Sequence, residues 1–155
     1  MVFTRAEGGN MHRSYFLGSI VGVGIALISA TAFAASSLPS NIKTEHTKLG
    51  TVYATSKGMT VYEFKKDTPN SHKSTCYGQC AEPWPAVKAP TKFKTMKPWG
   101  SMVRKSGGKQ LTYDGYPLYT WSKDTKPGDV PSQGVKGLWR VAKPGAKQIS
   151  WTQKP

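Results

Sequence analysis

The sequence predicts a mainly β fold: a small single domain of two tandem repeats, each containing a β-hairpin, related by a pseudo-two-fold axis. Short runs rich in Val, Tyr, Thr, Phe and Trp alternate with clusters of Gly, Pro and Asp, which is typical of strands joined by turns. The pattern Tyr-x-aromatic-x-x-Asp occurs at 62–67 and again 57 residues later, at 119–124, which indicates an internal duplication. Long Pro/Gly-rich loops and one short disulfide complete the expected architecture.

The first 34 residues have the pattern of a secretory signal peptide. Arg5 and Arg13 precede an apolar run over residues 15–28, and the segment ends in Ala32-Phe33-Ala34. We expect cleavage near Ala34, a periplasmic or secreted location, and no transmembrane segment in the cleaved protein. The alternative is an uncleaved anchor, since residues 15–35 are long enough to span a bilayer.

The segment after the signal peptide is expected to be a flexible leader over residues 35–48, because it is rich in Ser, Pro and Asn. A β-repeat domain is expected over residues 49–152. Within it, repeat one should cover residues 49–98 and repeat two residues 99–152.

Each repeat contains two candidate strands around a turn. In repeat one, residues 49–55 and 59–64 flank Ser56-Lys57-Gly58. In repeat two, residues 109–113 and 116–121 flank Asp-Gly, the strongest short-range hairpin signal. Three further elements are expected: strands over 101–105 and 138–142, and a short helix over 76–82. We expect each half to consist of a hairpin and a return strand that carries a tryptophan.

The similarity between the halves extends beyond the motif, because Trp84 and Trp139 follow the two motif tyrosines at nearly equal distances. Over roughly residues 49–142 the chain resembles the secreted and lipoprotein repeat family defined by Tyr-x-[Phe/Trp/Tyr]-x-x-Asp. The resemblance implies an exported repeat domain and no known biochemical activity. Many members are lipoproteins, whereas this chain has no cysteine near residue 34 to carry a lipid.

The aromatic residues of each motif copy should point to the same side of a strand. Side chains at positions i and i+2 share a face, so Tyr62 pairs with Phe64 and Tyr119 with Trp121. We expect these rings to fill the core between the two halves, with the tyrosine hydroxyls reaching polar partners. The alternative is a ring-lined groove for a ligand.

The motif aspartates need a partner that serves both copies. An Asx-turn would join Asp124 to the amide of Lys126, but the same bond fails for Asp67, because Pro69 has no N–H. The candidates for a shared role are another backbone amide, a tyrosine hydroxyl or a lysine.

The two cysteines, Cys76 and Cys80, lie four residues apart. In an oxidising exported compartment they are expected to form a structural disulfide. Two alternatives stay open: a redox-active dithiol, and a soft metal site for copper in which His72 joins the two thiols. No cofactor is expected.

The charge of the chain is strongly positive. The formal net charge is +14, and losing Arg5, Arg13 and Glu7 with the signal peptide leaves +13. This excess predicts an anionic envelope component or an acidic protein as partner, although it also serves solubility. Lysines greatly outnumber arginines, and no nucleic-acid-binding motif is present, so specific nucleic-acid recognition is not expected.

The sequence carries no nucleophile elbow, phosphate loop or zinc-protease helix. We therefore expect an exported, non-enzymatic basic β-repeat domain that binds an anionic envelope partner or surface. The alternative is a periplasmic redox or copper-handling protein that uses Cys76, Cys80 and His72.

Overall fold

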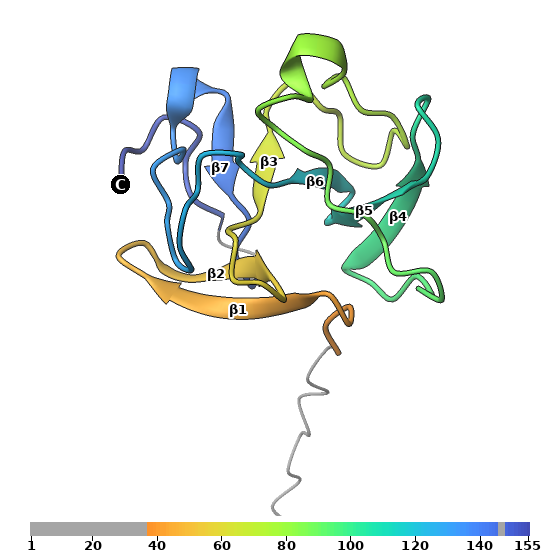
Figure 1. Ribbon diagram of the computed structural model, residues 1–155, viewed down its shortest axis with the longest axis horizontal. Coiled ribbons are helices and arrows are strands. Elements are labelled where there is room, and N and C mark those ends of the chain that lie inside the picture. Colours follow the sequence, from red (N-terminus) through yellow and green to blue (C-terminus); the bar gives the residue numbers. More distant parts are fainter. Residues whose placement is uncertain (1–36, 146–147) are drawn as a thin grey trace, which may run out of the picture. The chain divides into compact units, whose positions relative to one another are not determined.

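The computed structural model describes residues 37–145 and 148–155 (Figure 1). The predicted signal peptide and its cleavage site lie outside these residues. The described part is mainly β, as the sequence predicted, with two sheets and two short 3₁₀ helices. None of its helices has the length and apolar character needed to cross a membrane.

A two-stranded antiparallel sheet lies at the N-terminal end of the described chain. It pairs β1 (Ile42–Thr47) with β2 (Gly50–Thr55). The expectation of a flexible leader is therefore wrong for residues 42–47. Only one β1 side chain is buried, that of Ile42, so the strand lacks the apolar alternation by which a sequence reveals a strand.

A five-stranded antiparallel sheet forms the larger part of the fold, in the order β4-β5-β6-β3-β7. Its strands are β3 (Tyr62–Phe64), β4 (Trp99–Val103), β5 (Lys109–Tyr113), β6 (Tyr116–Tyr119) and β7 (Trp139–Val141). The predicted hairpin of repeat two is confirmed as β5–β6. Asp114 and Gly115, with φ of 47° and 79°, form its two-residue turn, and positive φ at both positions is what a type I′ turn requires.

The predicted hairpin of repeat one is only partly formed. The chain turns at Gly58 and makes the bridge Ala54↔Thr60, but β2 and β3 belong to different sheets. The predicted helix over 76–82 is reduced to the 3₁₀ helix η1 (Gly78–Cys80). A second 3₁₀ helix, η2 (Val135–Gly137), precedes β7.

The protein has two aromatic-rich core clusters, and neighbouring residues of one strand belong to different clusters. Leu118 belongs to the first cluster and Tyr119 to the second. Because neighbouring residues of a strand point to opposite faces, the sheet is buried on both sides. The first cluster contains Ile42, Tyr53, Val61, Val87, Trp99, Leu111, Tyr113, Leu118 and Ala142. The second contains Val52, Tyr62, Phe64, Cys76, Trp84, Tyr119, Val130, Trp139 and Val141.

The two repeats exchange their return segments. The return strand of repeat two, β7, pairs with the motif strand of repeat one, β3. In turn, the segment after Trp84 pairs with repeat two through the bridges Ala86↔Tyr119 and Lys88↔Gln110. This segment is extended but too irregular to count as the expected strand, because Pro83 and Pro85 interrupt it.

Equivalent backbone hydrogen bonds confirm the pseudo-two-fold relation. The Lys65 amide donates to Leu138 O, and at the equivalent place in the other half the Ser122 amide donates to Pro83 O. In the same way, the Ala142 amide donates to Val61 O and the Val87 amide donates to Leu118 O. The motif strands β3 and β6 meet at the centre, where Tyr62 is opposite Tyr119.

Candidate functional site

A stack of indole rings joins the two motif copies. The rings of Trp84 and Trp139 lie parallel, with centroids 3.5 Å apart. Trp139 also stacks on Phe64, and Trp84 contacts Trp121, at 4.3 and 4.4 Å. Each tryptophan therefore covers the aromatic residue at the third position of the other repeat's motif.

The motif tyrosines and aspartates form crossed pairs. The hydroxyl of Tyr119, from repeat two, donates to Asp67 of repeat one at 2.6 Å. The hydroxyl of Tyr62 donates to Asp124 of repeat two, at 3.4 Å. Burial is the largest cause that raises the pKa of both tyrosines, and the neighbouring carboxylate adds to it. The hydroxyls therefore stay protonated and donate to the aspartates across the repeat boundary.

Asp124 does not form the Asx-turn that its sequence position would allow. The amides of Thr125 and Lys126 donate to Asp129 instead, both at 3.0 Å. Asp129 lies on the outer side of this loop, where its carboxylate can receive both amides. Asp124 is thereby free to point inward to Tyr62, which gives the two motif aspartates the shared role that the sequence left open.

The two crossed pairs have unequal surroundings. Asp67 also accepts bonds from the amide and hydroxyl of Thr75, at 2.7 and 2.8 Å. Asp124 has only Tyr62, and its Oδ2 atom is buried without a hydrogen-bond partner. Burial raises the pKa of Asp124 to about 7.

A network around Arg104 supports the better-bonded pair. The Arg104 guanidinium donates to Gln110 Oε1, to Ser74 Oγ at 3.2 Å and to the Cys76 carbonyl at 2.6 Å. The Tyr119 hydroxyl uses its one hydrogen to donate to Asp67, so Ser74 Oγ is the donor in its 2.7 Å contact with Tyr119. Arg104 is 9% exposed, and all of these acceptors are neutral.

A buried ion pair occupies another part of the same sheet. Glu63 in β3 is fully buried, and its Oε2 atom accepts two bonds from Arg140 in β7, at 2.6 and 2.7 Å. Burial raises the pKa of Glu63 to about 7, against the opposing attraction of Arg140. The Arg140 guanidinium lies 4.1 Å from the Trp151 ring, which attaches the C-terminal segment to the sheet.

Cys76 and Cys80 form the predicted disulfide, with a Cα–Cα distance of 5.2 Å. In this state neither sulfur is a thiolate, so the two cysteines cannot ligate a metal together with His72. His72 lies on the loop before η1, where it lines a cavity instead. The disulfide closes the loop over residues 76–80, and the Cys76 carbonyl at the start of this loop accepts the hydrogen bond from Arg104.

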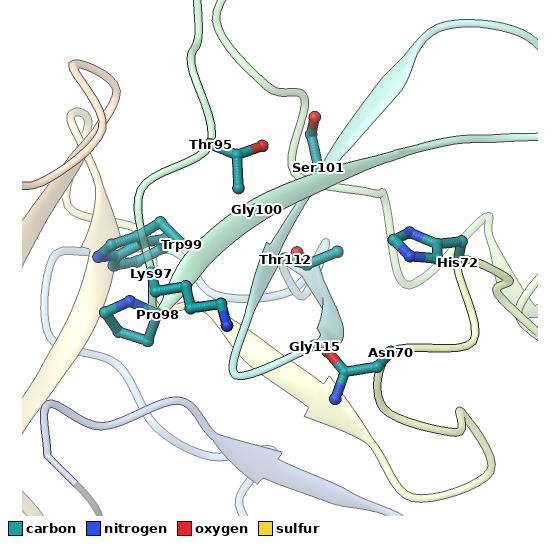
Figure 2. A pocket seen from close by; sticks show the side chains of 10 residues that line it. All are labelled: Asn70, His72, Thr95, Lys97, Pro98, Trp99, Gly100, Ser101, Thr112 and Gly115. Atoms are coloured by element: carbon teal, nitrogen blue, oxygen red, sulfur yellow. The ribbon is translucent and has the colours of Figure 1, made fainter.

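The cavity that contains His72 lies beside β4 (Figure 2) and has a volume of about 230 Å³. Figure 2 shows His72 and Asn70 on one side and Lys97 on the other, with Gly100 and Thr112 between them. Its lining combines polar side chains with Pro98 and Trp99 and contains no carboxylate. It could accept a small polar or anionic group, but its side chains are not arranged for a known catalytic role.

A larger basic groove lies next to the Arg104 network. It has a volume of about 540 Å³ and is lined by Lys88, Arg104 and Lys109, with Pro85, Ala86 and Ala89 as its apolar wall. No acidic residue lines it. None of the six predicted motif residues lines this groove. They are buried or half-buried and form the internal framework.

The groove and its network were not predicted from the sequence. One signal was available: Arg104 and Arg140 are the only arginines after the predicted signal peptide. Arg104 binds three acceptors at once, and Arg140 makes two bonds to the single Glu63 Oε2 atom, because the planar guanidinium presents several donors in a fixed geometry. The lysines, in contrast, are nearly all exposed.

These features define a two-repeat β domain with an internal aromatic–carboxylate framework. The chain belongs to the family described as a secreted repeat of unknown function, which it matches over residues 43–88 and 100–143. The two matched segments correspond to the two halves that pair across Tyr62 and Tyr119. Comparison with curated proteins and with solved structures found no match.

Proposed function

We propose that this protein is an exported, non-enzymatic domain that binds an anionic component of the cell envelope. The observation that carries the proposal is the basic groove around Arg104. Its guanidinium is held in place by neutral acceptors and, within the described residues, forms no ion pair with a carboxylate. A fixed, uncompensated charge beside Lys88 and Lys109 favours an anionic ligand.

The distribution of carboxylates strengthens this proposal. Glu63, Asp67 and Asp124 are buried and bonded inside the fold, so they do little to neutralise the surface. Residues 83–113, which supply the groove, contain no Asp or Glu. The exterior is therefore more basic than the net charge alone indicates, and this stretch is its most one-sided part.

The same placement argues against catalysis by the motif. Tyr62 and Tyr119 are fully buried, and the motif aspartates are nearly so. A catalytic group has to reach the reacting atoms of its substrate. These hydroxyls and carboxylates reach one another instead.

Salt-dependent retention on a heparin resin tests the proposal. Lys105 is exposed and lies between Arg104 and Ser106, which both line the groove. We expect the exported protein to bind at low salt and the variant Lys88→Glu/Lys105→Glu/Lys109→Glu to elute at much lower salt. The matched control is Lys48→Glu/Lys123→Glu/Lys126→Glu, because it changes the charge equally around a depression that already contains Asp129.

The groove variant should lose more retention than the control. Passage of the parent protein through the resin at low salt would contradict anion binding. Equal shifts in the two variants would show diffuse charge and would contradict the assignment to the groove.

A further inference from the structure

We propose that the loop from Pro90 to Pro98 docks this protein on the surface of an anionic phospholipid bilayer, with Phe93 and Met96 entering the interface. This inference rests on the proposed function and deepens it, because it names the class of anionic partner. The loop connects the segment around Lys88 to β4 and therefore adjoins the basic groove.

The loop presents apolar side chains that the fold leaves partly uncovered. Phe93 and Met96 pack with Leu38 against the first core cluster, yet all three are only partly buried. They line a depression of about 330 Å³ together with Pro39 and Pro90. Such side chains gain free energy when they enter the boundary between headgroups and acyl chains.

Lysines flank these apolar residues. Lys92 and Lys94 line the depression itself, and Lys97 follows Met96 directly. All three are exposed, and the sequence around them alternates basic and apolar residues: Lys-Phe-Lys-Thr-Met-Lys. A lysine stem can lie along the apolar surface while its ammonium group reaches a lipid phosphate.

The loop is held in shape by the fold. Met96 and Trp99 exchange two backbone hydrogen bonds, at 3.0 and 2.7 Å, and the Phe93 amide donates to Pro90 O at 2.9 Å. On the other side of the depression, the Asn41 side chain donates to Lys88 O at 2.9 Å. The apolar residues are therefore presented without a large cost for ordering the loop on contact.

The combination of features selects a bilayer over a soluble polyanion. A polysaccharide or an acidic protein surface would use the lysines and leave Phe93 and Met96 without a role. An anionic bilayer uses both, since polybasic segments near its surface gain about fivefold in affinity for each lysine and the apolar side chains add to this by insertion.

Flotation with lipid vesicles tests the inference. The exported protein is mixed with vesicles of phosphatidylglycerol and phosphatidylethanolamine, or of phosphatidylcholine alone. We expect binding to the anionic vesicles only. The variant Phe93→Ser/Met96→Ser should bind about tenfold more weakly, because two apolar side chains no longer insert. It should keep its retention on heparin.

A charge variant and its matched control complete the experiment. Lys92→Glu/Lys94→Glu/Lys97→Glu should weaken vesicle binding by about 100-fold or more. Lys65→Glu/Lys66→Glu/Lys136→Glu changes the charge equally on exposed positions outside the loop and should have a much smaller effect. Near-ultraviolet circular dichroism confirms that each variant is folded.

Four outcomes of these measurements would overturn the inference. Vesicle binding by the folded Phe93→Ser/Met96→Ser variant at the parent level would show that the loop does not insert. A change in oligomeric state in this variant, with vesicle binding unchanged, would assign the depression to contacts between copies. If the parent protein is retained on heparin but does not bind vesicles, the bilayer assignment alone is contradicted. If it binds neither, the proposed function is contradicted as well.

A second readout reports insertion directly. Thr91→Cys supplies the one free thiol, because the two native cysteines are paired. An environment-sensitive fluorophore on it should shift to shorter wavelength with anionic vesicles. An unchanged spectrum at saturating lipid would contradict entry of the loop.

Discussion

At the scale of single residues, the motif works by exchange between its two copies. Each tyrosine hydroxyl donates a hydrogen bond to the aspartate of the other copy, and each tryptophan covers the aromatic residue at the third position of the other copy's motif. The motif therefore binds repeat to repeat. This explains why it recurs with an aspartate even where an Asx-turn cannot form.

The two crossed pairs should differ in strength. Tyr119→Phe removes a 2.6 Å bond to Asp67 and a 2.7 Å bond to Ser74. We expect it to lower the free energy of unfolding by about 2–3 kcal/mol, the usual range for a bond to a charged acceptor. Tyr62→Phe removes a bond of 3.4 Å and should cost less than about 1 kcal/mol. Urea denaturation measures both, and equal losses would contradict the unequal geometry.

The pKa of Asp124 predicts a pH dependence of unusual sign. In the folded protein this pKa is raised to about 7, well above the value of an unfolded aspartate. Between about pH 4 and pH 7 the folded state therefore binds more protons than the unfolded state, and stability falls as the pH rises. We expect the protein to be more stable at pH 5 than at pH 7.5.

Asp124→Asn separates this contribution from the rest. The variant should reduce the pH dependence by on the order of 2 kcal/mol and should stabilise the protein mainly at pH 7.5. Glu63 is unchanged in both proteins and cancels in the comparison. Thermal unfolding of both proteins between pH 5 and pH 7.5 measures the difference in pH dependence. An equal pH dependence of stability in the two proteins would contradict its assignment to Asp124.

At the scale of elements, the β5–β6 turn is held from outside as well as by its own conformation. Gly115 has a φ of 79°, and a Cβ atom there would overlap the Asn70 side chain. Gly107 has a similar φ of 86° in the β4–β5 turn but open space around it. Comparing alanine at Gly107 with alanine at Gly115 therefore separates the cost of backbone strain from the cost of the steric overlap.

Alanine at the two positions should have different costs. Gly107→Ala carries backbone strain alone, about 1 kcal/mol. Gly115→Ala has the same strain and must also displace Asn70, so we expect a loss larger by about 1–3 kcal/mol. Chemical denaturation of the two variants measures the difference. Equal losses would show that Asn70 moves aside freely.

The elements also show what the sequence could predict. The β5–β6 hairpin and the disulfide were predictable because their signals are local: an Asp-Gly turn and two cysteines four residues apart. Strand β1 was missed, since all but one of its side chains are partly or fully exposed. A tyrosine hydroxyl was one of three candidate partners for the motif aspartates, but its crossing between repeats and the Arg104 groove were not predictable, because they join residues far apart in the chain.

At the scale of the whole molecule, the exchanged segments make the two repeats interdependent. Strand β7 completes the sheet of repeat one, and the segment after Trp84 lies against β5 and β6 of repeat two. Both core clusters combine residues of the two halves, and Trp84 stacks on Trp139 across them, so we expect neither half to form its core alone.

Separate halves should therefore be unfolded. We expect fragments 37–98 and 99–155 to show random-coil amide spectra alone and to recover dispersed spectra when mixed. Two-dimensional NMR of each fragment and of the mixture tests this. A folded single fragment would show that the repeats are independent domains joined in tandem.

The whole molecule also separates framework from surface. Carboxylates of the motif are used inside, which leaves a basic exterior and the uncompensated groove at Arg104. Its family is described as a secreted repeat, which places it in the envelope or outside the cell. An exterior of this charge is suited to the anionic surfaces found there.

The most direct test of this division is the affinity of the folded Tyr62→Phe variant for heparin, measured beside the parent protein. The Tyr62 hydroxyl lies in the internal framework and shares no hydrogen-bond partner with Arg104, so we expect an affinity within about twofold of the parent. A tenfold loss of affinity in the folded variant, about 1.4 kcal/mol, would show that the motif itself takes part in binding and would contradict the account.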